Sequence, residues 1–258
     1  MKRLKWPIID LIPRGVGEKS ISAPCASDST QINNQVKIVL AGDSTVTFNK
    51  GWGTGFTAQL NQDMTVCVNL AQGGRSSKSY RDEGYWSKVL EEKPDWLIIQ
   101  FGHNDRPGKG PKLESDPQTT FPDNLERFID EARDINAKPV LVTPLTKRYF
   151  STEDDKIHSD LSLYAEATKR IGIKKQVPVI DLHTKSIQLF EMLGRRTSFL
   201  FGPQKEQKVG KEKLTHPDLT HLNELGGQII GTIVVEELVH VVPEMEKLFL
   251  EIKMPVVE

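Results

Sequence analysis

The sequence predicts an α/β fold in three layers, with a parallel sheet of five strands between two layers of helices. Two observations lead to this fold class. From residue 36 onward, short apolar runs rich in β-branched residues alternate with longer amphipathic stretches. That alternation is typical of a parallel sheet covered by helices on both faces. A chain of 258 residues is also long enough to bury such a core without disulfide bonds.

The elements follow one another in regular order along the chain. The apolar runs interpreted as strands are residues 37–40, 65–70, 96–101, 139–143 and 177–180. The amphipathic stretches interpreted as helices are residues 53–62, 79–92, 121–135, 160–174, 184–193 and 224–239. The helix expected at 121–135 places Leu125, Phe128, Ile129 and Ala132 on one stripe, which is the face we expect it to bury.

Three segments lack a sustained hydrophobic period. Residues 1–34 are rich in Ser, Pro and Asn and are interpreted as an irregular N-terminal arm, followed by one domain over 35–258. Residues 194–217 are basic and are expected to form a long loop, either a functional lid or rim or a solvated excursion. Residues 243–258 are expected to add a short helix and a tail.

The bulk composition argues against several classes of function. Hydrophobic residues make up 37% of the chain and charged residues 27%, with a formal net charge of -1. This lacks the basic excess typical of nucleic-acid-binding proteins, so we expect no nucleic-acid partner. No apolar run approaches the roughly 20 residues of a membrane span, so we expect no membrane partner either. Oligomeric state has no signature in the sequence.

The first residues and the cysteines bear on the compartment. The start is basic, but Pro7, Asp10 and Pro13 interrupt the run of about 7–15 apolar residues that a signal peptide needs. We therefore expect a cytoplasmic protein, with a secreted or periplasmic location as the alternative. Cys25 and Cys67 are either two free thiols or one disulfide.

Polar and glycine-rich blocks follow the predicted strands, at the edge where ligands bind in a sheet of this kind. A fourth block lies just before the last helix. The four are Gly42-Asp43-Ser44-Thr45, Gly73-Gly74-Arg75-Ser76, Gly102-His103-Asn104-Asp105 and Asp218-Leu219-Thr220-His221.

Together the four blocks contain the groups that acyl transfer requires. Ser44 supplies a hydroxyl nucleophile, His221 a base for its proton, and Asp218 a carboxylate to orient that base. The oxyanion would be bound by the backbone N–H groups of Ser44 and Gly74 and by the side-chain amide of Asn104. Glycine at position 74 would let a backbone donor approach the substrate without a Cβ in the way.

On these four blocks, together with Gly51-Trp52-Gly53, the chain resembles the SGNH branch of the GDSL esterases. Within that branch it is similar to the rhamnogalacturonan acetylesterases of carbohydrate esterase family 12, whose blocks occur in the same order. The resemblance implies a flavodoxin-like fold and no metal or organic cofactor. It also implies the same assignments: the nucleophile at Ser44, further oxyanion donors at Gly74 and Asn104, and the acid and base at Asp218 and His221.

Each motif also has a simpler interpretation. Gly-Asp-Ser-Thr is a good turn or helix N-cap sequence. Residues 73–79 could be taken for a phosphate-binding loop, but they match neither of the two common patterns for one. Two imidazoles and a carboxylate, from His216, His221 and Asp218, suggest a metal site, but no further ligand is evident, so we expect no metal. Arg75 is a candidate for binding an acidic sugar. Three aromatic side chains are candidates for stacking on sugar or, more simply, for helix packing: Trp52, Tyr80 and Trp86.

The sequence therefore predicts a carboxylic ester hydrolase that deacetylates a carbohydrate, with pectic rhamnogalacturonan as the expected substrate and an acyl-enzyme at Ser44. One alternative is a thioesterase or lysophospholipase of the same broader family, although no apolar loop suggests a long acyl channel. Another is a carbohydrate-binding domain that keeps the fold without catalysis. The particular sugar and the acetylated position have no signature in the sequence.

Overall fold

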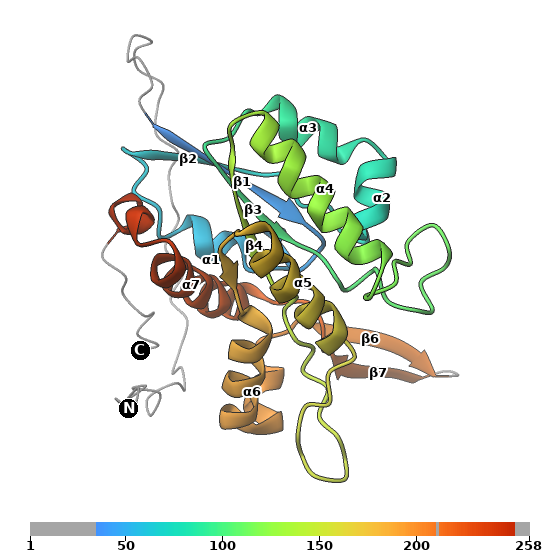
Figure 1. Cartoon of the computed structure of the whole chain (residues 1–258). Helices are drawn as coiled ribbons and strands as arrows, with labels where there is room; N and C mark the ends of the chain where they lie inside the picture. The colour runs from blue at the N-terminus through green and yellow to red at the C-terminus, as the bar shows by residue number, and fades with distance from the viewer. Residues whose placement is uncertain (1–34, 210–211, 251–258) are drawn as a thin grey trace.

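The computed structural model describes residues 35–209 and 212–250. Its centre is a sheet of five parallel strands in the order β2-β1-β3-β4-β5, as Figure 1 shows. The strands are β1 (Val36–Gly42), β2 (Thr65–Asn69), β3 (Trp96–Gln100), β4 (Lys138–Val142) and β5 (Val179–Ile180). The predicted parallel sheet is therefore confirmed, with strand ends that differ by one or two residues from the expected ones.

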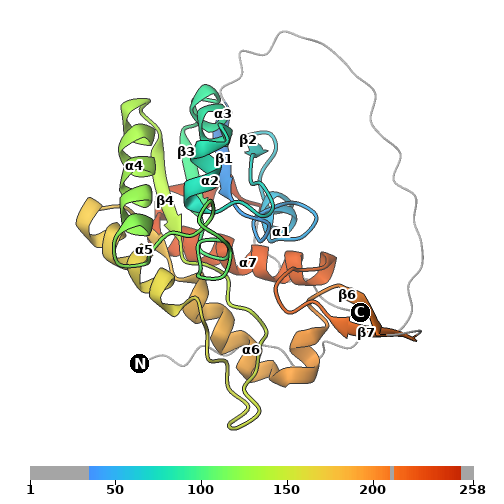
Figure 2. The same ribbon diagram turned by 90° about the vertical axis from the view of Figure 1, so that its right-hand side faces the viewer.

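The two faces of the sheet carry separate apolar cores. Along β1, Ile38 and Leu40 belong to one core and Val39 and Ala41 to the other, because successive side chains of a strand point to opposite faces. Helices cover both faces, as the two perpendicular views show (Figures 1 and 2). The first core is completed by α1 (Gly53–Thr57), α6 (Leu182–Phe199), α7 (Glu224–Val241) and the 3-10 helix η1 (Pro243–Leu248). The second is completed by α2 (Ser77–Asp82), α3 (Tyr85–Glu91), α4 (Thr120–Asp134) and α5 (Ser162–Lys175).

The helix predicted over residues 79–92 is wrong in one respect, because two short helices occupy that stretch. Gly84 separates α2 from α3 and has a φ of 80°. This left-handed conformation ends one helix and is one that glycine adopts without strain. The helix α6 also runs further than the expected 184–193 and changes direction at Gly194, whose φ is 74°.

The prediction of one long loop over residues 194–217 is wrong. The C-terminal part of α6 comes first, and an antiparallel hairpin of β6 (Gln204–Val209) and β7 (Glu212–Pro217) follows. Residues 204–207 and 213–216 are exposed on both strands. A ribbon without a buried face needs no alternation of apolar and polar residues, so the sequence carried no strand signal. The hairpin ends directly before Asp218.

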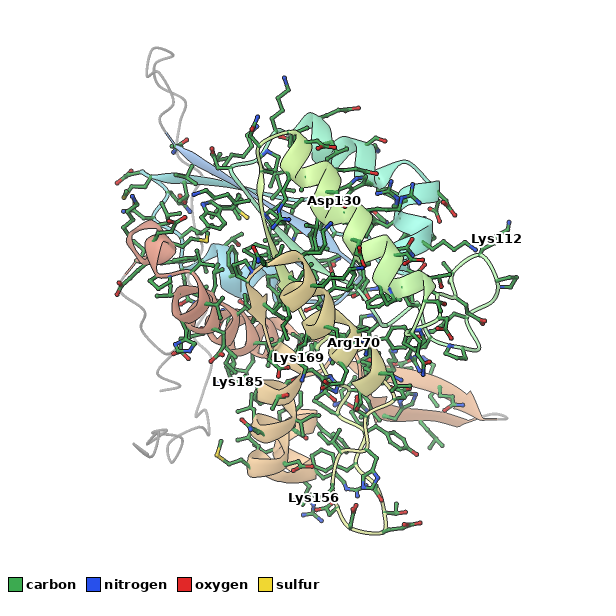
Figure 3. All side chains as sticks on the ribbon, viewed as in Figure 1. Lys112, Asp130, Lys156, Lys169, Arg170 and Lys185 are labelled. Carbon is green, nitrogen blue, oxygen red and sulfur yellow. The ribbon has the colours of Figure 1, made fainter. Side chains whose placement is uncertain are left out.

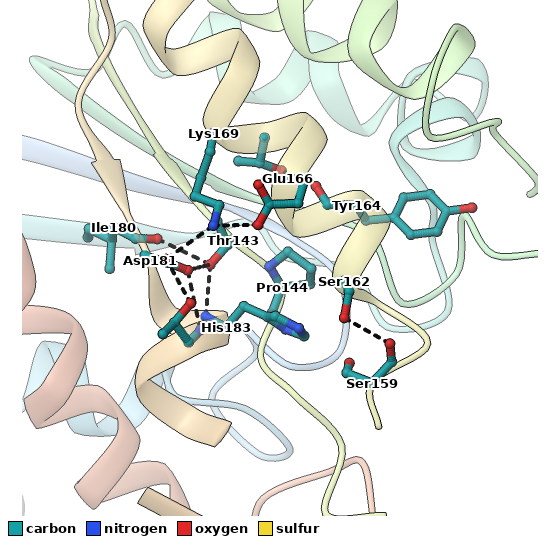
Figure 4. Close-up of polar contacts among 12 residues, drawn as sticks. Thr143, Pro144, Ser159, Ser162, Tyr164, Glu166, Lys169, Ile180, Asp181 and His183 are labelled. Atoms are coloured by element: carbon teal, nitrogen blue, oxygen red, sulfur yellow. Dashed lines mark hydrogen bonds and ion pairs between the residues drawn. The ribbon is translucent and has the colours of Figure 1, made fainter. Parts of the chain in front are cut away.

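Residues 143–161, between β4 and α5, form a long excursion away from the sheet. Figure 4 shows the contacts at its two ends. At the first end, the Nδ1–H of His183 donates to the carbonyl of Pro144 at 3.0 Å, and the backbone N–H of His183 donates to Thr143 Oγ1 at 2.8 Å. At the second, Ser162 Oγ donates to the carbonyl of Ser159 at 2.9 Å. The excursion is thus fixed to the start of α6 and to α5.

Two remaining expectations concern other parts of the chain. The N-terminal arm over 1–34, Cys25 and the tail after residue 250 lie outside the described residues, and Cys67 is half-buried in β2. Within residues 35–209 and 212–250, no helix has the length and apolar character needed to cross a membrane.

Candidate active site

Ser44 lies in the turn that directly follows β1, and a buried hydrogen-bond network holds that turn in place. The carboxylate of Asp43 accepts from the backbone N–H of Thr45 at 2.8 Å and from its hydroxyl at 2.7 Å. Gln100, at the end of β3, donates to the same hydroxyl at 2.6 Å and accepts from the indole N–H of Trp52 at 2.9 Å. The turn is therefore tied both to the neighbouring strand and to the entry of α1.

The hydroxyl of Ser44 meets the imidazole of His221, although the two residues are 177 positions apart. Ser44 Oγ lies 3.0 Å from His221 Nε2, and His221 Nδ1 lies 2.7 Å from Asp218 Oδ2. Since a carboxylate accepts, Nδ1 carries the proton and Nε2 is free to accept from the serine. Ser44 is 8% exposed and the His221 side chain 24% exposed, so a small ester can reach them from solvent.

Asp218 is held by backbone groups on one oxygen and by side chains on the other. Its Oδ1 accepts from the backbone N–H groups of Thr220 at 2.9 Å and His221 at 3.0 Å. Its Oδ2 is shared by the imidazole of His221 and the ammonium of Lys205, each at 2.7 Å. Burial alone would raise the pKa of Asp218, but these donors outweigh it and hold that pKa well below its usual range.

The loop that carries Asp218 and His221 is also fixed from behind by a buried arginine. Arg148, in the excursion after β4, is 0% exposed. Its Nη2 donates to the backbone carbonyls of both Asp218 and His221, each at 2.6 Å, and its backbone N–H donates to the carbonyl of Leu219 at 2.8 Å. Burial lowers the pKa of Arg148 to about 10, which leaves the guanidinium charged at neutral pH.

The three groups expected to bind an oxyanion lie in neighbouring loops. Gly73 approaches Ser44, because a Cβ added at Gly73 would lie 3.6 Å from the serine Cβ. Asn104 Nδ2 donates to the carbonyl of Arg75 at 3.1 Å, which leaves one amide hydrogen for a ligand. Within the described part of the chain, no protein acceptor occupies the backbone N–H of Ser44 or Gly74.

The reason given for glycine at position 74 needs correction. A Cβ added there would meet nothing within 4 Å of the protein, so crowding does not require glycine. The backbone at Gly74 has a φ of 78°, and this left-handed conformation is the reason that glycine is favoured there. It turns the chain between β2 and α2.

Two buried ionisable groups lie behind these loops. Asp105 accepts from the backbone N–H of Ser77 at 3.0 Å and from its hydroxyl at 2.5 Å, which joins the second and third blocks. Complete burial raises the pKa of Asp105 to about 7 despite those donors. Burial also lowers the pKa of His103 to about 4, so its imidazole is neutral at physiological pH.

The aromatic candidates for sugar binding are wrong. Trp52 and Tyr80 are both 0% exposed, so neither ring can stack on a sugar, and Trp86 is also buried. Each fills one of the apolar cores, in agreement with the simpler interpretation. Arg75 remains at the surface, where Glu83 holds its guanidinium at 2.9 Å.

The loop of residues 218–221, which carries Asp218 and His221, is called the acid–base loop below. Two residues that contact it could not be recognised as site residues from the sequence. Lys205 belongs to the basic segment that was expected to form a long loop, but nothing in its spacing pointed to Asp218. Arg148 lies in a segment without a recognisable motif. The role of Arg148 can be recognised only in the folded structure, where its guanidinium meets the buried carbonyl groups of Asp218 and His221.

His216 is exposed, and its Nδ1–H donates to the carbonyl of Pro217 at 3.3 Å. In the part of the chain that the structure describes, no three His, Cys, Asp or Glu side chains are arranged to hold a metal ion.

Comparison with known proteins agrees with this fold. The model of the GDSL-like lipase/acylhydrolase family matches residues 40–229. The chain is 34% identical to rhamnogalacturonan acetylesterase RhgT of Bacillus subtilis, over 78% of this chain and 88% of that protein. It is 36% identical to the probable rhamnogalacturonan acetylesterase YesY of Bacillus subtilis, over 64% of this chain and 78% of that protein.

Solved structures share the fold at lower identity. Protein YXIM of Bacillus subtilis has a TM-score of 0.64 and 23% identity, over 80% of this chain and 56% of that one. An acetylxylan esterase from Geobacillus stearothermophilus has a TM-score of 0.55 and 16% identity, over 80% of this chain and 96% of that one. With the family match covering most of its length, this chain belongs to the GDSL-like lipase/acylhydrolase family.

Proposed function

We propose that this protein is a serine esterase that removes acetyl groups from pectic rhamnogalacturonan through an acyl-enzyme at Ser44. The observation that carries the proposal is the 3.0 Å contact between Ser44 Oγ and His221 Nε2, with Asp218 on the far side of the imidazole. The substrate class comes from two relatives, RhgT, named a rhamnogalacturonan acetylesterase, and YesY, named a probable one. An acetylated carbohydrate is thus the expected partner.

In the first half of the reaction, His221 Nε2 takes the hydroxyl proton of Ser44 as Oγ attacks the acetyl carbonyl carbon. The negative charge that develops on the carbonyl oxygen is stabilised by the N–H groups of Ser44 and Gly74 and by the amide of Asn104. The C–O bond to the sugar then breaks. His221 gives its proton to the departing sugar oxygen, which leaves the acetyl group on Ser44.

The second half repeats these steps with water. His221 takes a proton from a water molecule, whose oxygen attacks the acyl carbon. The bond to Ser44 Oγ then breaks, and the serine regains its proton from the imidazolium as acetate leaves. Throughout, Asp218 stays ionised, because its pKa lies well below its usual range, and so it stabilises the imidazolium in both halves.

The test compares Ser44→Ala with the wild type in acetate release and in hydrolysis of 4-nitrophenyl acetate. We expect Ser44→Ala to lose at least about 10⁴-fold in kcat, because the substitution removes the hydroxyl that forms the acyl-enzyme. Ser87→Ala is the matched control, since Ser87 is exposed on α3. If Ser44→Ala kept wild-type turnover, the proposal would be wrong.

A substrate panel tests the sugar. We expect acetate release from acetylated rhamnogalacturonan to exceed that from acetylated xylan and chitin fragments. A series of esters from acetyl to octanoyl tests the acyl group, and a preference for the longer chains would contradict an acetylesterase.

A further inference from the structure

A cavity of about 370 Å³ lies at the base of the excursion that follows β4. Lys147, Tyr149, Ile157 and Asp160 line it from the excursion, and Leu219 closes the side nearest to the acid–base loop. No role in the acyl transfer described above uses this cavity. It nonetheless adjoins the site, because Leu219 immediately follows Asp218 in the chain.

The cavity is also connected to the loop that carries Asn104. Arg106 Nε donates to the carbonyl of His103 at 3.1 Å, and the guanidinium of Arg106 pairs with the carboxylate of Asp160. Lys147 Nζ binds the same oxygen of Asp160 at 2.6 Å. The cavity therefore lies between the acid–base loop on one side and the Asn104 loop on the other. These contacts make the cavity a candidate position for a sugar next to the acetylated one.

Three ion-paired side chains at one wall of the cavity carry a net positive charge. Lys147 and Arg106 contribute two positive charges, and Asp160, which both of them bind, contributes one negative charge. In the described residues the ammonium of Lys147 has no acceptor besides Asp160, although it carries three hydrogens. The cavity can therefore bind one carboxylate at Lys147 without losing the internal ion pair.

The other walls suit the ring of a sugar. Tyr149 is 64% exposed, which is unusual for a large aromatic side chain and leaves its ring available at the mouth. Ile157 and Leu219 supply apolar surface beside it. A pyranose has apolar C–H faces that pack on such a ring, whereas a free phosphate would use the positive charge and none of the apolar wall.

We propose that this cavity is a subsite for a uronic acid residue of the substrate, in which Lys147 binds the uronate carboxylate and Tyr149 packs against the sugar ring. The inference rests on the proposed function and deepens it, because it assigns the residues that select an acidic over a neutral polysaccharide. It adds a binding role to a segment that carries none of the four sequence blocks.

The experiment measures kcat/KM for one acetylated galacturonate-containing oligosaccharide in two forms, with free carboxylates and with methyl-esterified carboxyls. The two forms share their acetyl groups and backbone and differ in charge. We expect the wild type to prefer the acidic form about tenfold, the effect of one hydrogen bond to a charged group. Lys147→Met should abolish that preference, and Lys147→Arg should retain most of it.

Lys156→Met is the matched control. Lys156 lies on the same excursion (Figure 3) but does not line the cavity, and its ammonium pairs with Glu191 at 3.3 Å. It should keep the wild-type preference. Tyr149→Ala should raise KM for both forms by a similar factor, because packing on a ring does not depend on charge.

The inference is overturned if the wild type does not distinguish the two forms, or if Lys147→Met keeps the preference as fully as Lys156→Met does. Failure of the proposed function looks different, because Ser44→Ala would then retain hydrolysis of 4-nitrophenyl acetate. If Lys147→Met does not fold, Ser44→Ala provides a second test. Its affinity for the deacetylated acidic oligosaccharide should exceed that for the methyl ester and should fall as salt is added.

Discussion

The two halves of the candidate site are built by different means. Ser44 follows a buried strand, and the residues that fix its turn lie in the turn itself, at the end of β3 and at the start of α1. Asp218 and His221 follow a polar hairpin and precede α7. They are fixed by Arg148 from a distant excursion and by Lys205 from the hairpin itself.

The difference shows how each half responds to change. The nucleophile half is set by backbone geometry and by short hydrogen bonds of the buried side chains of Asp43 and Gln100, so it should respond little to added salt. The acid–base half is set by long cationic side chains, one of them half exposed, so its electrostatics are open to adjustment. The following predictions test this comparison, in order of decreasing effect.

The largest effect is expected for Asp218→Asn. The amide keeps the size of the carboxylate but cannot hold the Nδ1–H tautomer or stabilise the imidazolium. We expect kcat for 4-nitrophenyl acetate to fall about 10⁴-fold with little change in KM. A loss below tenfold would show that Asp218 does not orient His221.

A smaller effect is expected for Asn104→Ala, which removes one oxyanion donor. We expect kcat to fall about 10²–10³-fold, with KM nearly constant, because the lost hydrogen bond forms mainly in the transition state. The fall should be equal at pH 6 and pH 8, since the removed group does not titrate. Asn124→Ala serves as a comparison. It also removes a side-chain amide, but that amide donates to Ser77 Oγ at 2.9 Å and is not an expected donor to the carbonyl oxygen of the substrate.

The smallest effect, and the one specific to the acid–base half, is expected for Lys205→Met. Lys205 and His221 share one oxygen of Asp218, so without the ammonium the full carboxylate charge stabilises the imidazolium. Arg148 keeps its position behind the loop in this variant. We expect the acidic limb of the profile of kcat/KM against pH to move upward by about half a unit.

The same substitution changes stability in a defined pH window. Lys205 helps to hold the folded-state pKa of Asp218 below its ordinary value, so its contribution to stability is present above about pH 4 and is lost as the pH falls through the folded-state value. The melting temperature of Lys205→Met should therefore be lower than that of the wild type at pH 6, and the two should converge in acid.

Lys213→Met is the matched control for both measurements. Lys213 lies on the same hairpin and pairs with Glu206 at 2.9 Å, away from Asp218. It should leave the pH profile of the wild type unchanged. An equal shift in both variants would mean that Lys205 acts through the general charge of the hairpin.

Several parts of the fold could be predicted from local patterns. The five parallel strands are short apolar runs, and the blocks at Ser44, Gly74 and Asn104 come directly after three of them. Because parallel strands all end at the same edge, succession in the chain becomes proximity in space. The break at Gly84 was missed because an isolated glycine in an amphipathic stretch is compatible with a continuous helix.

Other parts depended on contacts that no local pattern contains. In the sequence, Trp52 lies near a catalytic block and looks like a binding residue. In the structure it is buried, and burial is possible because its indole N–H donates to Gln100. The hairpin of β6 and β7 has no apolar face to show a period. The cavity beside Lys147 forms from an excursion and from Leu219, which lie more than fifty residues apart.

The sequence by itself predicted the sheet, the ester hydrolase and the candidate groups for its chemistry, because hydrophobic period and residue type are local properties that short motifs express fully. Only the tertiary structure decided which cations surround Asp218, which aromatic rings reach solvent, and which residues line the cavity beside Lys147. Those features depend on distances between segments far apart in the chain, which are set by how the helices, the excursion and the hairpin pack around the sheet.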